Sequence, residues 1–181
     1  RAPFVDPFCG SGTLAIEAAM LALRVPPGLQ RSFACWEWPS FDRERWDRQA
    51  DAARADILQR ELVVMASDRD DGAIAATLAN AARAGVTVQA ERRAISDLAL
   101  PAKRGWIVTN PPYGQRTGDP ATVRDLYDRT GAVLRERASG WQLSVLAPPE
   151  PPLVGRLGIE LTETLRTSNG GIPVVLSSGP I

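Results

Sequence analysis

Short apolar segments alternate with longer segments of helical periodicity along the chain, and few folds can accommodate this alternation. We expect strands at about 3–8, 62–67, 86–92, 105–109 and 142–147, a final strand pair near 160–166 and 172–178, and helices at about 13–24, 71–84 and 121–138. Such an order predicts a doubly wound α/β domain with a mostly parallel sheet. Asn169-Gly170-Gly171 is a hairpin signal between the last two strands, so we expect an antiparallel strand at one edge.

The sequence Asn110-Pro111-Pro112-Tyr113 follows the apolar run 106–109, which has the character of a buried parallel strand. Two consecutive prolines cannot continue a strand or enter a helix interior, so the chain leaves the sheet in a stiff turn. We call residues 110–113 the acceptor turn, because it offers the Asn110 side-chain oxygen and the backbone carbonyls of Asn110 and Pro111 beside the Tyr113 ring. Such acceptors suit a planar base that carries an exocyclic amino group. All four residues are therefore candidate catalytic residues.

A glycine-rich turn lies near the start of the chain, between the first strand and a helix that we expect from Thr13. Gly10 and Gly12 allow the backbone to approach a ligand closely, and the N–H groups that open the helix face the same place. Turns of this kind also bind dinucleotides or phosphates, or bind no ligand at all. The third glycine of the dinucleotide fingerprint is missing, because Ala15 occupies that position. The Gly-Lys-Ser/Thr ending of a P-loop is missing too.

Composition limits the chemistry further. The chain has 181 residues, of which 44% are hydrophobic, and we expect one globular domain over 1–181. There is no histidine, and Cys9 and Cys35 have no metal-ligand spacing, so we expect neither a metal site nor histidine-based acid–base catalysis. We interpret Cys9 as a packing residue rather than a nucleophile, because no basic partner is visible. No apolar run reaches about 18 residues and no secretory signal is visible, which predicts a cytoplasmic protein without membrane spans.

The segment 25–61, called the insertion below, separates the first helix from the second strand. It should contain an amphipathic helix whose apolar face carries Trp46, Ala50, Ala53 and Ile57. Arg43, Arg45 and Arg48 lie mostly on the opposite face, which we expect to be solvated, with phosphate binding as the alternative. Trp36 and Trp38 alternate as on a strand, and we expect both to pack rather than to stack on bases.

The helix expected at 71–84 has clear boundary signals. Asp70 is the expected N-cap and Gly85 the expected C-terminal residue. Ile74, Leu78 and Ala81 share one face of this helix, which we expect to pack in the core.

The order of these motifs resembles a family of RNA methylases that includes the large-subunit rRNA guanine-N2 methyltransferases and related tRNA enzymes. Its members have often been labelled N6-adenine-specific DNA methylases. The similarity covers nearly the whole chain and is carried by Asp6-Pro7-Phe8-Cys9-Gly10-Ser11-Gly12-Thr13 and the acceptor turn, with additional matches at 27–29, 33–39, 80–86, 114–116, 126–127 and 168–170.

This resemblance implies a class I S-adenosylmethionine-dependent methyltransferase fold, with S-adenosylmethionine as cofactor and RNA, above all rRNA, as partner. The cofactor-binding residues that it implies are Asp6, Pro7, Phe8, Gly10, Gly12, Thr13, Asp68, Asp97 and Asn110. Asp68 would accept hydrogen bonds from the ribose hydroxyls. Asp97 would contact the adenine amino group, and the alternative for it is a turn carboxylate without a ligand. The family normally carries a preceding helix and an RNA-binding THUMP domain, so we expect this chain to be a catalytic fragment that lacks them, and a monomer by default.

The resemblance favours the 2-amino group of a guanine in rRNA as the target, and the alternative is the 6-amino group of adenine in RNA or DNA, because the acceptor turn suits both amino groups. The formal net charge is zero, so phosphate attraction offers little to offset the few kcal/mol that flipping a base from a duplex costs. One stacking contact returns about 1–3 kcal/mol, which favours an unpaired RNA base over intact DNA. Two further alternatives are a nicotinamide-dependent dehydrogenase and a catalytically idle binding module. The missing third glycine argues against the first, and the intact acceptor turn argues against the second.

Overall fold

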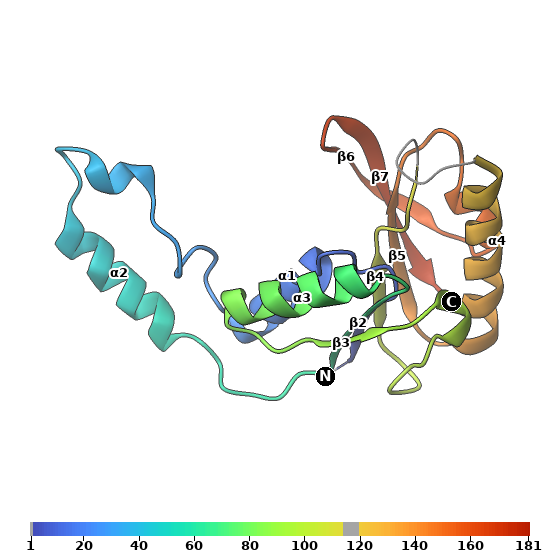
Figure 1. Ribbon diagram of the computed structural model, residues 1–181, viewed down its shortest axis with the longest axis horizontal. Coiled ribbons are helices and arrows are strands. Elements are labelled where there is room, and N and C mark those ends of the chain that lie inside the picture. The colour runs from blue at the N-terminus through green and yellow to red at the C-terminus, as the bar shows by residue number, and fades with distance from the viewer. Residues whose placement is uncertain (1, 114–119) are drawn as a thin grey trace.

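The computed structural model describes residues 2–113 and 120–181, and its centre is a seven-stranded sheet (Figure 1). The strand order is β3-β2-β1-β4-β5-β7-β6. The strands are β1 (Phe4–Asp6), β2 (Val64–Asp68), β3 (Gln89–Arg92), β4 (Trp106–Thr109), β5 (Gln142–Ala147), β6 (Thr162–Asn169) and β7 (Ile172–Pro180). β1 to β5 pair in parallel, whereas β7 is antiparallel to both β5 and β6. The expected mostly parallel sheet with an antiparallel edge is therefore confirmed.

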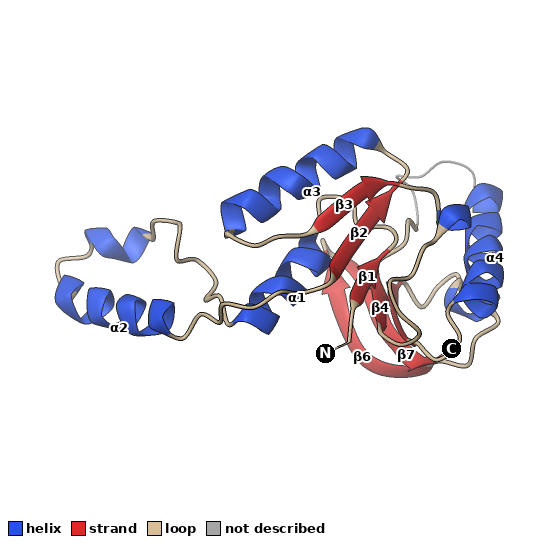
Figure 2. Cartoon of the chain, turned by 90° about the horizontal axis from the view of Figure 1, so that it is seen from below, coloured by secondary structure: helices blue, strands red, loops and turns tan. Residues whose placement is uncertain are grey.

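Helices cover both faces of the sheet, each over its own hydrophobic core (Figures 1 and 2). On one face, α1 (Thr13–Leu23) and α3 (Asp71–Ala84) pack over a cluster that includes Ile16 and Val64. On the other face, α4 (Pro120–Arg137) packs over a larger cluster. The described residues also form three 3-10 helices: η1 (Ala34–Glu37), η2 (Ile95–Asp97) and η3 (Val154–Leu157). Within the described ranges, no helix is both long enough and apolar enough to cross a membrane.

The direction in which strands are added reverses between β1 and β4. From β1 the chain builds outward through β2 to β3, and from β4 it builds outward in the opposite direction to β5. Ligands of open α/β sheets bind at such a switch point, in the crevice outside the carboxyl ends of the strands. β1 and β4 end at Asp6 and Thr109, so the glycine turn and the acceptor turn both start from this crevice.

Some predicted strand boundaries were too wide. β1 ends at Asp6 rather than near residue 8, because the Asp6 carboxylate accepts the N–H of Phe8 and bends the chain into a turn. Val86 and Val88 are buried as a strand would require, yet pairing with β2 begins at Gln89.

The boundaries of α3 agree with the sequence, but one of its predicted core residues is misplaced. Asp70 accepts the N–H of Ala73 at 2.8 Å as the N-cap, and Gly85 ends the helix with φ 71°. Leu78, however, is 47% exposed, and Thr77 is buried in its place. The reason is that the Thr77 hydroxyl reaches from the helix to the glycine turn, which rotates Leu78 toward solvent.

The insertion projects away from the sheet (Figures 1 and 2) and contains the expected amphipathic helix, α2 (Arg43–Ala55). Ile57 lies beyond the end of α2, so it does not extend the apolar face. The predicted strand alternation of Trp36 and Trp38 is wrong, because Trp36 lies within η1 and its N–H bonds to the Phe33 carbonyl three residues earlier.

In the insertion, one tryptophan packs as predicted, whereas a second tryptophan and one arginine differ from the prediction. Trp36 packs edge-on against the ring of Trp46, as expected of a packing residue. Trp38 is 63% exposed and does not pack. Arg43 is not simply solvated, since its guanidinium carbon lies 4.7 Å from the centre of the Trp36 ring, in a cation–π contact.

Candidate active site

The crevice at the switch point is closed at its base by two buried polar residues, Asp6 and Thr109. The Thr109 hydroxyl donates a hydrogen bond to Asp6 Oδ1 at 2.7 Å, and the Phe8 backbone N–H donates to the same oxygen at 3.2 Å. The ends of the two central strands are therefore tied together through one carboxylate. This bond fixes the distance from which the glycine turn and the acceptor turn depart.

Burial raises the pKa of Asp6 to about 6, because loss of hydration penalises the charged carboxylate. The hydrogen bonds from Thr109 and Phe8 oppose this rise, and the nearby negative charge of Asp68 adds to it. At neutral pH the carboxylate is mostly ionised but poorly hydrated. A positively charged group of a ligand placed beside it would be favourable.

The glycine turn between β1 and α1 is held from α3. The Thr77 hydroxyl donates to the Gly10 carbonyl at 3.0 Å, and the Asn80 side-chain amide donates to the Ser11 carbonyl at 2.8 Å. Gly12 has φ 86°, and a Cβ there would lie 2.7 Å from the Thr77 side chain, so this close approach requires glycine. At Gly10 no atom lies within 4 Å of such a Cβ, so the turn is open toward a ligand there.

Asp68 connects the glycine turn to the end of β2. Its Oδ2 accepts the N–H of Gly10 and its Oδ1 accepts the N–H of Asp70, each at 3.1 Å. A carboxylate oxygen can accept two hydrogen bonds, so each oxygen keeps capacity for a further donor. Two adjacent hydroxyl groups of a ligand could use both oxygens at once.

Cys9 lies in the glycine turn but is not set up for nucleophilic chemistry. Burial raises the pKa of its thiol to about 11, although a contact with the Thr77 hydroxyl at 3.6 Å opposes the rise. The reactive species of cysteine is the thiolate, which is scarce at neutral pH for such a group. This agrees with the packing role inferred from the sequence.

The acceptor turn contains a hydrogen-bond acceptor to which no described residue donates. The side-chain oxygen of Asn110 is buried and has no hydrogen-bond partner among residues 2–113 and 120–181. Pro111 is buried, and Pro112 and Tyr113 are half-buried. An unpaired buried acceptor costs about 1–3 kcal/mol, so a ligand that brings a donor to this oxygen would stabilise the turn.

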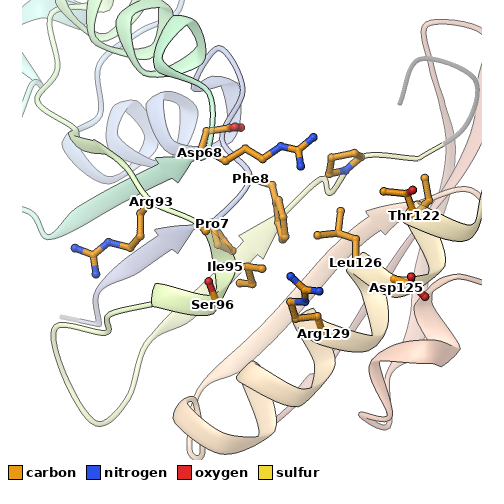
Figure 3. A pocket seen from close by; sticks show the side chains of 14 residues that line it. Pro7, Phe8, Asp68, Arg93, Ile95, Ser96, Thr122, Asp125, Leu126 and Arg129 are labelled. Carbon is orange, nitrogen blue, oxygen red and sulfur yellow. The ribbon is translucent and has the colours of Figure 1, made fainter. Parts of the chain in front are cut away.

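A cavity of about 290 Å³ lies beside these residues, at the carboxyl ends of β1 to β4 (Figure 3). Phe8 and Ile95 on the sheet side lie across it from Leu126 of α4. Its polar groups include the carboxylate of Asp68 and the hydroxyl of Ser96. The full lining is Pro7, Phe8, Asp68, Arg69, Arg93, Ala94, Ile95, Ser96, Pro112, Thr122, Val123, Asp125, Leu126 and Arg129. A slot with apolar walls and a carboxylate at one end suits an aromatic ring that carries a sugar.

The predicted site residues are not placed alike. Pro7, Phe8, Asp68 and Pro112 line the cavity. Asp6, Gly10, Gly12, Asn110, Pro111 and Tyr113 lie in the strand end and turns that border it, where the bonds described above link several of them. Thr13 is exposed at the start of α1 and does not line the cavity. Asp97 is exposed at the end of η2 and does not line it either, while its neighbours Ile95 and Ser96 do.

Sequence reasoning missed two groups of residues. The α4 side of the cavity consists of Thr122, Val123, Asp125, Leu126 and Arg129, which recur at helical spacing and could have been recognised from it. Thr77 and Asn80 are also three residues apart on one helix face. No local pattern indicates that this pair holds the glycine turn, because the contact is made across the fold.

Comparison with known proteins decides the family. The family model described as UPF0020, RMKL-like, methyltransferase domain, matches residues 1–153. The chain belongs to this family. A Synechocystis sp. protein provisionally named an RNA methyltransferase is 34% identical over 180 residues, which are 96% of this chain and 46% of that protein. The ribosomal RNA large subunit methyltransferase K/L of Shewanella baltica is 34% identical over 175 residues, 93% of this chain and 24% of that enzyme. The chain thus spans less than half of these relatives.

Solved structures agree with the family assignment. SMU.472, provisionally described as a methyltransferase and crystallised in complex with SAH, matches with a TM-score of 0.89 and 29% identity. The match covers 98% of this chain and 47% of SMU.472. The fold is therefore the class I methyltransferase fold, as the motifs predicted.

Proposed function

We propose that this domain transfers a methyl group from S-adenosylmethionine to the exocyclic amino group of a base in RNA, with the 2-amino group of guanine in rRNA as the target. The observation that carries the proposal is the buried, unpartnered side-chain oxygen of Asn110 at the switch point. It stands beside a cavity with a carboxylate at one end and adjoins a glycine turn that is open at Gly10. The names of the relatives support methyl transfer and, for two of them, an RNA substrate.

The residues present fit S-adenosylmethionine. Asp68 has acceptor capacity for the two ribose hydroxyls, and Ile95 and Leu126 offer apolar walls for the adenine ring. Asp6 is the poorly hydrated carboxylate that would favour the positive charges of the methionine portion. Asp97 is assigned to the adenine amino group by the resemblance alone. When bound, this cofactor supplies a methyl group on a sulfonium, which passes to the base nitrogen as the carbon–sulfur bond breaks, leaving S-adenosylhomocysteine and a released proton.

The acceptor turn prepares the base nitrogen for this step. The lone pair of a base amino group is delocalised into the ring, so the nitrogen is planar and weakly nucleophilic. Asn110 Oδ1 would hold one amino hydrogen and the Pro111 carbonyl another, which favours a more tetrahedral nitrogen aimed at the methyl group. Tyr113 would stack on the ring. Positioning of this kind can contribute several kcal/mol, and no histidine is needed.

The unpaired nature of many RNA bases supports RNA as the substrate, since this chain carries no net charge to offset the cost of flipping a base from a duplex. The choice between guanine and adenine rests on the family resemblance, because both bases present an amino group to the same acceptors. Adenine-N6 in RNA or DNA is therefore the second candidate.

Mass spectrometry of nucleosides from a strain that lacks the gene tests the proposal. Loss of an N2-methylguanosine from rRNA, restored by the wild-type gene, is the expected result. Loss of N6-methyladenosine instead would keep the chemistry and replace the base. Unchanged methylated nucleosides in both RNA and DNA would overturn the proposal.

A further inference from the structure

The β6–β7 hairpin reaches past the other strands at the edge of the sheet where the site lies (Figure 1). β6 is antiparallel to β7 and β7 is antiparallel to β5, so β6 runs in the direction of the parallel strands and its last residue, Asn169, lies at their carboxyl edge. β7 pairs with β5 as far as Val175, and three more pairs with β6 follow before the turn. Three residues of strand extend about 10 Å, so the hairpin end reaches beyond the carboxyl end of β5.

The hairpin end is joined to the acceptor turn by one hydrogen bond. The side-chain amide of Asn169 donates to the Tyr113 hydroxyl at 3.0 Å, although 56 positions separate the two residues. Asn169 is exposed, and the two-residue turn that follows it, Gly170-Gly171, has φ values of 57° and 84°. Both values are positive, as in the tight hairpin turn that fixes strand register, so the position of Asn169 is well defined.

Tyr113 is consequently held at three places. Its backbone follows the two prolines of the acceptor turn, part of its ring packs against the core cluster beneath α4, and its hydroxyl is bound by Asn169. A tyrosine ring can rotate about two side-chain bonds, and the hydroxyl is the atom farthest from the backbone. The hydroxyl oxygen lies on the axis of rotation about the Cβ–Cγ bond, so a hydrogen bond at that atom restricts rotation about the Cα–Cβ bond and fixes where the ring lies, while packing of the ring restricts its tilt.

We propose that Asn169 is a positioning residue, which holds the Tyr113 ring in the place where it forms one wall of the base site. This inference rests on the proposed function, in which Tyr113 stacks on the target base. Asn169 itself touches the base in no step, and acts through the tyrosine. The antiparallel edge of the sheet, far from the cofactor cavity in sequence, is thereby part of the machinery that orients the substrate.

Fluorine NMR tests the holding of Tyr113 without any need for activity. The chain has two tyrosines, so protein labelled with 3-fluorotyrosine gives two signals, which Tyr113→Phe assigns. Tyr127 is buried in α4 and serves as the internal reference. In Asn169→Ala we expect the Tyr113 signal to move toward that of free fluorotyrosine and the Tyr127 signal to stay. Thr167→Ala is the matched control, since Thr167 is exposed two residues earlier on the same face of β6. An unchanged Tyr113 signal in Asn169→Ala would overturn the inference.

Methyl transfer to total rRNA from a strain lacking the gene tests the consequence. Asn169→Ala should lower kcat/KM for RNA about three- to tenfold, as expected for one neutral hydrogen bond, and leave the KM for S-adenosylmethionine unchanged. Tyr113→Phe should have a similar effect, and the double variant should be no worse than either, because both changes remove the same bond. Additive losses would show that Asn169 acts elsewhere and would overturn the inference. A wild-type protein that methylates no RNA would refute the proposed function instead, while the NMR spectra would still decide whether Asn169 holds Tyr113.

Discussion

The crevice at the switch point and the projecting insertion are built by opposite means. In the crevice, polar contacts join residues far apart in the chain: Thr109 with Asp6, 103 positions away, and Gly10 with Asp68, 58 positions away. In the insertion, aromatic contacts join near neighbours, such as Trp36 and Trp46. The crevice therefore depends on the whole sheet for its geometry, whereas the insertion depends mainly on itself.

The crevice and the insertion also differ in how far they are built into the hydrophobic cores. Neither hydrophobic cluster contains a residue between 26 and 61. The insertion is tied to the domain at its base, where the Leu58 N–H donates to the Leu23 carbonyl at 2.8 Å. Changes in the crevice should accordingly alter cofactor binding or methyl transfer, and changes in the insertion should not.

The largest effect is expected from Asn110→Ala, which removes the unpartnered buried acceptor. We expect methyl transfer to RNA to fall at least a hundredfold, because the positioning that the acceptor provides contributes several kcal/mol. Affinity for S-adenosylmethionine, measured by calorimetry, should change less than threefold. Asn110→Asp, which keeps an acceptor oxygen, should retain more activity than the alanine variant. Normal transfer by Asn110→Ala would contradict the mechanism.

A smaller effect, on binding, is expected from Asp68→Ala. Hydrogen bonds to a charged acceptor contribute roughly 1.5–3 kcal/mol each, so the dissociation constant of S-adenosylmethionine should rise at least tenfold. Asp70→Ala is the control, because Asp70 is the neighbouring acid but caps α3. Asp70→Ala should lower the free energy of unfolding by about 1 kcal/mol and leave the dissociation constant of S-adenosylmethionine unchanged. Equal affinities of wild type and Asp68→Ala would remove Asp68 from the site.

Asp6→Asn should stabilise the protein while testing the cost of burying a charge in the crevice. The pKa of Asp6 in the folded state, about 6, lies above its usual value. The folded state therefore binds the proton more tightly, and the stability gained from neutral Asp6 is full below about pH 4 and lost as the pH rises through 6. Asn is neutral at every pH, so the free energy of unfolding of Asp6→Asn should exceed that of wild type by as much as about 3 kcal/mol at pH 7.5.

Urea unfolding at pH 7.5 and pH 4.5 measures this difference. The advantage of Asp6→Asn should shrink at the lower pH, where wild-type Asp6 is protonated in the folded state. A difference that is the same at both pH values would show that the buried carboxylate does not titrate in this range. Cofactor affinity should fall in the same variant, since it removes a negative charge from the methionine end of the site.

What the sequence could predict follows the same division between local and distant contacts. The strand–helix order, the glycine turn and the acceptor turn depend on adjacent residues, and the structure has them at the expected places. Asp70 as an N-cap and Asp68 at the end of β2 were also accessible, because caps and strand ends have local signals. Thr77 and Asn169 were missed, since each acts on a segment more than 50 positions away. The strand predicted from Trp36 and Trp38 was wrong because the local signal was too short. A period of two over three residues cannot distinguish a strand from a 3-10 turn.

The smallest effect on function is expected from Trp46→Ala. The Trp46 ring is the centre of the insertion's aromatic contacts, lying 5.4 Å from Phe33, 5.7 Å from Trp36 and 6.1 Å from Phe41 between ring centroids. Its removal should speed backbone amide exchange across the insertion, because these contacts hold η1 against α2. Exchange in β1 and β4 and the affinity for S-adenosylmethionine should change less than twofold.

Trp38→Ala is the control for Trp46→Ala, since Trp38 is largely exposed and should leave exchange unchanged. If Trp46→Ala instead lowered the affinity for S-adenosylmethionine tenfold, the insertion would be energetically coupled to the crevice, although the contacts of the two regions are separate. The coupling would have to pass through the base of the insertion, where Leu58 bonds to the end of α1, the helix that opens from the glycine turn. Such a result would break the contrast between the two regions, because the local contacts of one would then determine the geometry of the other.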